Sequence, residues 1–189
     1  MLIDYVAYAQ RNGIKYSPVE THHITVDALE AAAKDQGVEF KPGDILIVRA
    51  GLVKWYNETQ DQRLREETIA NRFEYAGVQA SEKTVKWLWN KHFSAVAGDA
   101  PAFESLPMSS NGFCEWQSET FILLTILTIV SVLHDYCLSL YGMPIGEFWD
   151  LEKLAQTCEK LKRYSFLVTS APLNVDGGVA SPPNTLAIF

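Results

Sequence analysis

The chain has 189 residues, a length that fits one domain with a sizeable core, and its formal net charge is −7. Acidic side chains outnumber basic ones by 23 to 16, and no basic run is present to neutralise phosphates, so a nucleic-acid partner is not expected. The cysteines Cys114, Cys137 and Cys158 form no C-x-x-C pair, and the N-terminus does not resemble a secretory signal. We therefore expect reduced thiols and a cytoplasmic protein.

Apolar periodicity and capping residues predict helices that alternate with buried strands in the first half of the chain. The expected elements are strand 2–3, helix 4–12, helix 26–36, strand 45–48 and a helix from 82 to about 89. Thr25 and Ser81 are plausible N-caps, and Gly37 follows the end of the second helix. The polar segment 57–65 reads as a surface loop or the start of a helix.

The second half continues the alternation. We expect strand 95–98, loop 105–112, a helix over 151–163 capped by Asp150, and strands over 165–170 and 186–189. The apolar run 121–133 spans only about 20 Å as a helix, short of the roughly 30 Å hydrocarbon core, so it is interpreted as a buried core element rather than a membrane span. Together the elements predict one α/β domain over residues 1–189.

His134 and Glu147 are the strongest candidate functional residues. A neutral imidazole and a carboxylate separated by the turn signal 142–144 can converge as metal ligands. Each also has an ordinary interpretation, His134 as a core or surface histidine and Glu147 as a helix-entry residue. Asp99 follows a small apolar strand and is a candidate catalytic or substrate-side group, although Asp-Ala-Pro is also a good turn. Glu104 is a weaker candidate.

Four blocks of sequence resemble the cyclase family of metal-dependent hydrolases, which includes bacterial kynurenine formamidases (arylformamidases of tryptophan catabolism), and more closely its fungal branch. The blocks are GVEFKPGDILIVR at 37–49, AGDAPAFE at 97–104, LHDY at 133–136 with GMPIGEFWDLEKL at 142–154, and GGVASPPN at 177–184. Their order and rough spacing also match, so the resemblance covers most of the chain.

The resemblance implies a cyclase-like, swivelling β/β/α barrel-like domain of mixed α/β class that assembles as a homo-oligomer. It implies hydrolysis of a small amide, lactone or cyclic substrate by a divalent cation, zinc or manganese. His134 and Glu147 match the later metal ligands of the family, with His134 as a ligand or the general base. No membrane partner is implied.

The resemblance breaks at the start of the chain, where the family's His-x-Gly-Thr-His-x-Asp motif is absent and Met1 corresponds to a point downstream of it. We therefore expect an N-terminally truncated domain, from a truncated or mis-spliced gene model. His22, His23 and Asp27 offer superficially similar ligands. However, adjacent residues of an extended segment point in opposite directions, and an acidic residue in the first turn of a helix needs no metal to explain it.

Two alternatives to the hydrolase remain open from the sequence. One is a catalytically inactive cyclase-like domain that acts as an oligomer partner or is a nonfunctional fragment. The other is a metal-independent lyase or isomerase in which Glu147 or His134 acts as the acid or base.

Overall fold

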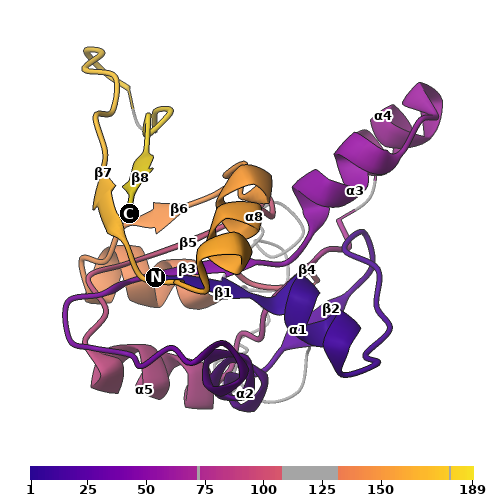
Figure 1. The fold of residues 1–189 in the computed structure, drawn as a ribbon. Helices are drawn as coiled ribbons and strands as arrows, with labels where there is room; N and C mark the ends of the chain where they lie inside the picture. Colours follow the sequence, from indigo (N-terminus) through magenta and orange to yellow (C-terminus); the bar gives the residue numbers. More distant parts are fainter. Residues whose placement is uncertain (72, 108–131, 179) are drawn as a thin grey trace.

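The computed structural model describes residues 1–71, 73–107, 132–178 and 180–189 (Figure 1). Its centre is a parallel sheet of four strands in the order β1-β3-β5-β6. The strands are β1 (Leu2–Asp4), β3 (Ile45–Arg49), β5 (Ala95–Gly98) and β6 (Ile145–Gly146). Parallel strands joined by helices form the mixed α/β architecture that the sequence predicts.

Helices cover both faces of this sheet, with α8 on one side and α2 and α5 on the other (Figure 1). Successive strand residues point to opposite faces. Leu2 and Ile47 accordingly pack with the α8 side, whereas Ile3 and Leu46 pack with the α2 and α5 side. The sheet is thus apolar on both faces, as expected of a buried parallel sheet.

The helices begin and end at local sequence signals. Among them are α1 (Tyr5–Arg11), α2 (Val26–Gln36), α5 (Glu82–Lys91) and α8 (Glu152–Leu161). The side chains of Thr25 and Ser81 cap α2 and α5, and Gly37 ends α2 in the left-handed conformation, as predicted. Asp150 accepts a hydrogen bond from the Glu152 amide at 3.1 Å at the start of α8.

The region between β3 and α5 is more regular than the sequence predicts. The segment 57–65, expected to be a loop or helix start, contains the end of α3 (Leu52–Glu58) and the start of α4 (Gln62–Asn71). A small parallel sheet, which the sequence analysis missed, pairs β2 (His22–Ile24) with β4 (Ala76–Val78). Glu104 and Leu106 form bridges to Val78 and Tyr75, so the expected loop 105–112 begins in extended structure, and its residues 108–112 lie outside the described residues.

Gly77 permits this pairing. A Cβ atom at this position would lie 2.5 Å from the carbonyl carbon of Glu104. Only a residue without a side chain lets the two backbones approach so closely. The small sheet therefore determines where Glu104 lies.

The candidate histidine, His134, lies beside buried core residues in the sequence. It ends α7 (Val132–His134), and a π-helical turn, η1 (Asp135–Leu140), continues the chain. Leu133 and Cys137 are fully buried and pack in the same cluster as Ile24 and Val78. Most of the apolar run 121–133 lies outside the described residues. Within the part of the chain that the structure describes, no helix is long and apolar enough to span a membrane.

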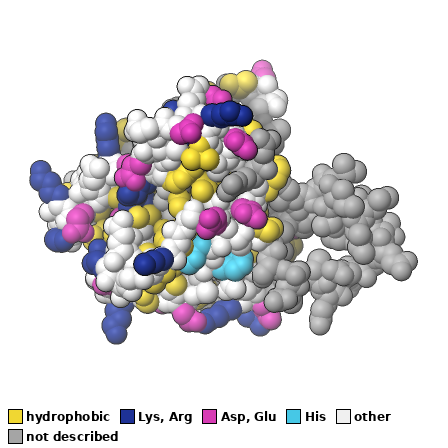
Figure 2. All heavy atoms as spheres, turned by 90° about the vertical axis from the view of Figure 1, so that its right-hand side faces the viewer, with side chains coloured by type: hydrophobic (Ala, Val, Ile, Leu, Met, Phe, Trp, Pro, Cys, Tyr) yellow, Lys and Arg dark blue, Asp and Glu magenta, His cyan; other side chains and the backbone are white. Residues whose placement is uncertain are grey.

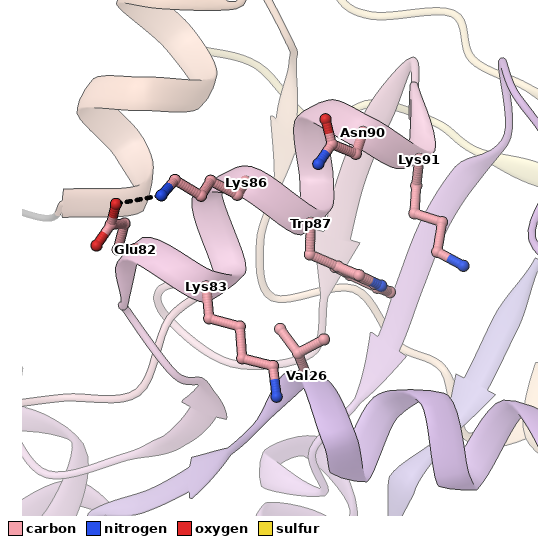
Figure 3. Close-up of a pocket in the computed structure, with 7 residues that line it drawn as sticks. All are labelled: Val26, Glu82, Lys83, Lys86, Trp87, Asn90 and Lys91. Carbon is pink, nitrogen blue, oxygen red and sulfur yellow. Dashed lines mark ion pairs between the residues drawn. The ribbon is translucent and has the colours of Figure 1, made fainter.

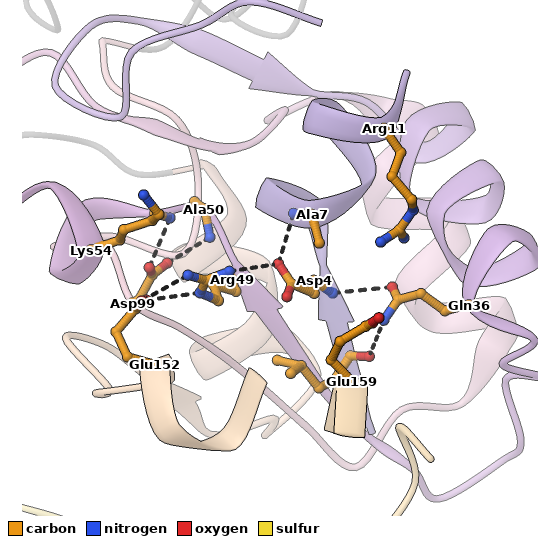
Figure 4. Close-up of polar contacts among 12 residues, drawn as sticks. Asp4, Ala7, Arg11, Gln36, Arg49, Ala50, Lys54, Asp99, Glu152 and Glu159 are labelled. Atoms are coloured by element: carbon orange, nitrogen blue, oxygen red, sulfur yellow. Dashed lines mark hydrogen bonds and ion pairs between the residues drawn. The ribbon is translucent and has the colours of Figure 1, made fainter. Parts of the chain in front are cut away.

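The chain ends in an antiparallel ribbon of β7 (Leu167–Thr169) and β8 (Leu186–Ile188), which stands apart from the central sheet (Figure 1). A buried ion-pair network ties the sheet to α8. Arg49 donates to Asp4 at 2.9 Å and to both carboxylate oxygens of Glu152 at 2.8 and 2.7 Å (Figure 4). This network joins β1, β3 and α8.

Candidate active site

His134 lies between two carboxylates. Its Nδ1 is 2.9 Å from Oε2 of Glu104, and its Nε2 is 3.1 Å from Oε1 of Glu147. The residues come from three places in the fold: the extended segment beside β4, the end of α7, and the position after β6. The structure thus brings together His134 and Glu147, as the sequence predicts, and adds Glu104.

The cluster runs from the interior to the surface. Glu104 is completely buried, whereas the side chains of His134 and Glu147 are 27% and 33% exposed. The second carboxylate oxygen of Glu104, Oε1, is buried and has no hydrogen-bond partner among the residues that the structure describes. A buried acceptor without a partner costs free energy, and such groups concentrate at functional sites. The exposed end of the cluster is the Nε2 side of His134 together with Glu147.

The two carboxylates control the protonation of His134. The hydrogen bond to Glu104, followed by that to Glu147, raises the pKa of His134 to about 10, although burial opposes the rise. At neutral pH both ring nitrogens therefore carry protons and donate, Nδ1 to Glu104 and Nε2 to Glu147.

The backbone around Glu147 is held firmly. The amide of Phe148 donates to the Ala100 carbonyl at 3.1 Å, and that of Trp149 donates to the Gly98 carbonyl at 3.0 Å. Gly146 makes room for the indole, because a Cβ atom there would lie 2.6 Å from Nε1 of Trp149. Phe148 has a φ of +54°, a left-handed conformation that is unusual for an aromatic residue. Strained residues of this kind often occur beside functional groups.

Asp99 has a structural position at the end of β5. It is fully buried, and its two carboxylate oxygens accept hydrogen bonds from the amides of Ala50 at 2.6 Å and Gly51 at 2.8 Å (Figure 4). Burial raises the pKa of Asp99 to about 6, while those two bonds oppose the rise. Asp99 therefore organises the backbone that leads into α3.

The other histidines have separate partners. His22 Nε2 lies 2.9 Å from the Tyr5 hydroxyl, whereas His23 Nδ1 lies 2.6 Å from the Ser105 hydroxyl. Asp27 forms an exposed ion pair with a lysine of α5. The adjacent histidines thus turn to different partners, and these three residues do not converge on one point.

The donor atoms around His134 decide whether a divalent cation fits. In residues 1–71, 73–107, 132–178 and 180–189, no group of three or more His, Cys, Asp or Glu is arranged to hold a metal ion. Glu104 nevertheless stands behind Nδ1 of His134, where metal-bound histidines commonly have a carboxylate. His134 Nε2 and Glu147 would then be two ligands, one short of the usual three protein ligands.

A hollow between α2 and α5 differs from the acidic site in the charge of its side chains. Figure 2 shows side chains of both charges spread over one face of the molecule. Three lysines line this hollow, as Figure 3 shows. Each lysine has an acidic partner: Lys83 with Asp27, Lys86 with Glu82, and Lys91 with Glu30. Because its cations are already paired, this hollow is an ordinary solvated surface.

Glu104 is the residue that sequence reasoning undervalued. It ends the block 97–104 that carries the resemblance, which is the only sequence signal that points to it. Cys137, close to the site in sequence, is fully buried, and burial raises the pKa of its thiol to about 12, so it is a structural residue.

Comparisons with known proteins agree with the fold. A sequence model of the Cyclase family matches residues 4–105, which include Asp99 and Glu104. A crystal structure described as that of a novel cyclase matches 100% of this chain with a TM-score of 0.74 and 30% sequence identity. The chain spans 52% of that structure's length. No curated protein matches the sequence. The chain therefore belongs to the Cyclase family and has the mixed α/β fold of its structural relative.

Proposed function

We propose that this chain carries part of the active site of a metal-dependent, formamidase-like hydrolase that acts on a small amide, lactone or related cyclic substrate. The supporting observation is the cluster of Glu104, His134 and Glu147, in which a buried carboxylate holds one nitrogen of a histidine and leaves the other beside a partly exposed carboxylate. The amide-type reaction and the fungal branch are suggested by the resemblance of the sequence.

Each residue has a distinct role in this proposal. Nδ1 of His134 donates a hydrogen bond to Glu104, which fixes the ring so that Nε2 faces Glu147. His134 Nε2 and Glu147 would be two ligands of a zinc or manganese ion, one fewer than the usual three protein ligands. When bound, such a cation polarises a carbonyl group and lowers the pKa of water.

The pKa of His134 makes cation binding depend on pH. The proton on Nε2 occupies the space between this nitrogen and Glu147, so a cation that binds there must displace it. Because the pKa is about 10, binding should strengthen as the pH rises from 7 to 9 and should release about one proton per ion.

Zinc content measured after dialysis at pH 8 tests this proposal. We expect about one zinc ion per chain, its loss in His134→Ala, and its retention in His92→Asn, which removes an exposed imidazole at the end of α5. Calorimetry in buffers with different ionisation enthalpies measures the released proton. Zinc that binds equally well to His134→Ala would contradict the proposed ligands. Turnover that persists in chelator would instead favour a metal-independent acid or base.

A second candidate function is a catalytically inactive cyclase-like domain that acts as an oligomer partner. It is favoured by the absence of a third metal ligand near His134 and Glu147 among the described residues. This second function predicts that the purified protein contains no metal and shows no turnover. Sedimentation would detect the homo-oligomer. We place either function in the cytoplasm, where the unpaired thiols of Cys137 and Cys158 would stay reduced.

A further inference from the structure

A hollow of about 550 Å³ lies beside the candidate site, between the segment that follows β6 and the β7–β8 ribbon. Glu147 lines this hollow and also contacts His134. A ligand in the hollow is therefore next to the exposed end of the acidic cluster. The volume is within the range of about 300–1,000 Å³ that is usual for small-molecule sites.

The walls of the hollow are largely apolar. Phe148 and Trp149 line it on the side of β6, and Phe166 and Val168 line it on the side of the ribbon, with Pro182 and Pro183 nearby. The backbone bonds of Phe148 and Trp149 hold the first wall in place. Rigid aromatic and proline walls suit a flat apolar group.

The ribbon has two different faces. Val168 pairs with Ala187, and both line the hollow. Leu167, the preceding residue on β7, is 63% exposed and is not part of the lining. This is the alternation expected of a β-strand, and it provides two neighbouring positions of which only one faces the hollow.

The charges of the hollow are all of one sign. Glu147 and Asp150 are its two charged lining residues, and the described lining contains no lysine or arginine. An anionic ligand would meet the like charge of these two carboxylates with no lysine or arginine of the described lining to offset it, which weakens binding. An uncharged ligand has no such penalty.

We propose that this hollow binds the apolar part of an uncharged amide or lactone substrate and selects against substrates that carry a carboxylate. The inference rests on the proposed function for the identity of the reacting bond. The binding preference itself follows from the lining alone. The reacting carbonyl lies at the Glu147 end, and the apolar group lies between Trp149 and the ribbon.

Two probes that differ in one carboxylate test the preference. They are formanilide, which is neutral, and 2-formamidobenzoate, which is the same molecule with an added carboxylate. Equilibrium binding is followed by ligand-observed NMR in the full chain, in chelator, so that turnover is not required. We expect formanilide to bind at least about tenfold more tightly.

Matched substitutions on β7 locate the site. Val168→Arg places a cation in the wall and should reverse the preference, whereas Leu167→Arg adds the same charge on the outward face and should leave the preference unchanged. Equal binding of the two probes, or the same effect from both variants, would overturn the proposal. If the preference is found but neither probe is hydrolysed when zinc is supplied, the hydrolase proposal fails while the binding site stands.

Discussion

Substitution of Glu104 by glutamine removes a buried negative charge while keeping the shape of the side chain. Glu104 is fully buried, and its Oε2 accepts a hydrogen bond from His134 Nδ1 over an N···O distance of 2.9 Å. In the variant the amide oxygen can still accept that bond, but it no longer attracts the positive ring by full charge. The variant therefore isolates the electrostatic part of the contact.

The size of the effect follows from the contacts of His134. Its pKa is raised from the ordinary value of 6.5 to about 10, and the bond to Glu104 is the largest cause. An opposite charge at this distance raises the pKa of a histidine by about 1–3. We expect the pKa of His134 to fall to about 8 in Glu104→Gln, with Glu147 maintaining the remainder. This difference corresponds to about 3 kcal/mol of proton affinity.

NMR titration of the histidine ring protons measures this pKa directly. The chain has four histidines, and His134→Ala identifies the relevant resonance. Glu82→Gln is the matched control, because Glu82 is an exposed acid on α5 that pairs with Lys86. The control should leave the pKa of His134 at about 10. A folded Glu104→Gln variant with an unchanged His134 pKa would refute the electrostatic reasoning.

Three further predictions concern stability. The pKa of His134 is higher in the folded than in the unfolded protein, so its protonation stabilises the fold, by on the order of 2 kcal/mol. This contribution to the free energy of unfolding should be complete below about pH 6.5 and be lost as the pH rises through 10. The difference in urea unfolding between wild type and His134→Gln measures it. Asp99→Asn should lower the free energy of unfolding at pH 8 by about 2 kcal/mol, because one of two buried amides loses its acceptor; no change in the urea midpoint would argue against the structural role. Gly77→Ala should lower the free energy of unfolding by about 3 kcal/mol, because the added methyl group pushes the backbone of Glu104 away. A urea midpoint equal to that of wild type would show that β4 and the segment around Glu104 are not packed as described.

The parts of the fold that could be predicted from the sequence are those with local signals. Thr25, Gly37 and Ser81 mark helix ends through hydrogen bonds to residues a few positions away, so the pattern alone predicts α2 and α5. The continuous apolar run of β3 likewise indicates a buried strand without reference to its neighbours.

The small sheet and the role of Glu104 depend on long-range pairing instead. β4 consists of Ala-Gly-Val, too short and too small to show strand periodicity, and it becomes a strand by pairing with β2, more than 50 residues earlier. Glu104 reaches His134 because β4 holds it there. Asp99 is similar, since its partners are amides 48 and 49 residues away along the chain.

The prediction that His134 and Glu147 converge succeeded for a different reason. Only 13 residues separate them, and the chain passes through one turn and β6 before Glu147 meets His134. The resemblance to a known family added the chemistry that the two residues could perform. Neither source indicated that a second carboxylate lies behind the histidine.

A crystal structure of the full chain grown with zinc at pH 8, with anomalous data collected at the zinc edge, tests the central claim most directly. We expect an anomalous peak between His134 and Glu147, about 2.0–2.2 Å from Nε2 and from a carboxylate oxygen, with Glu104 still bonded to Nδ1. Crystals in which that space has no peak, while His134 keeps its bonds to both carboxylates, would contradict the assignment of these residues as metal ligands.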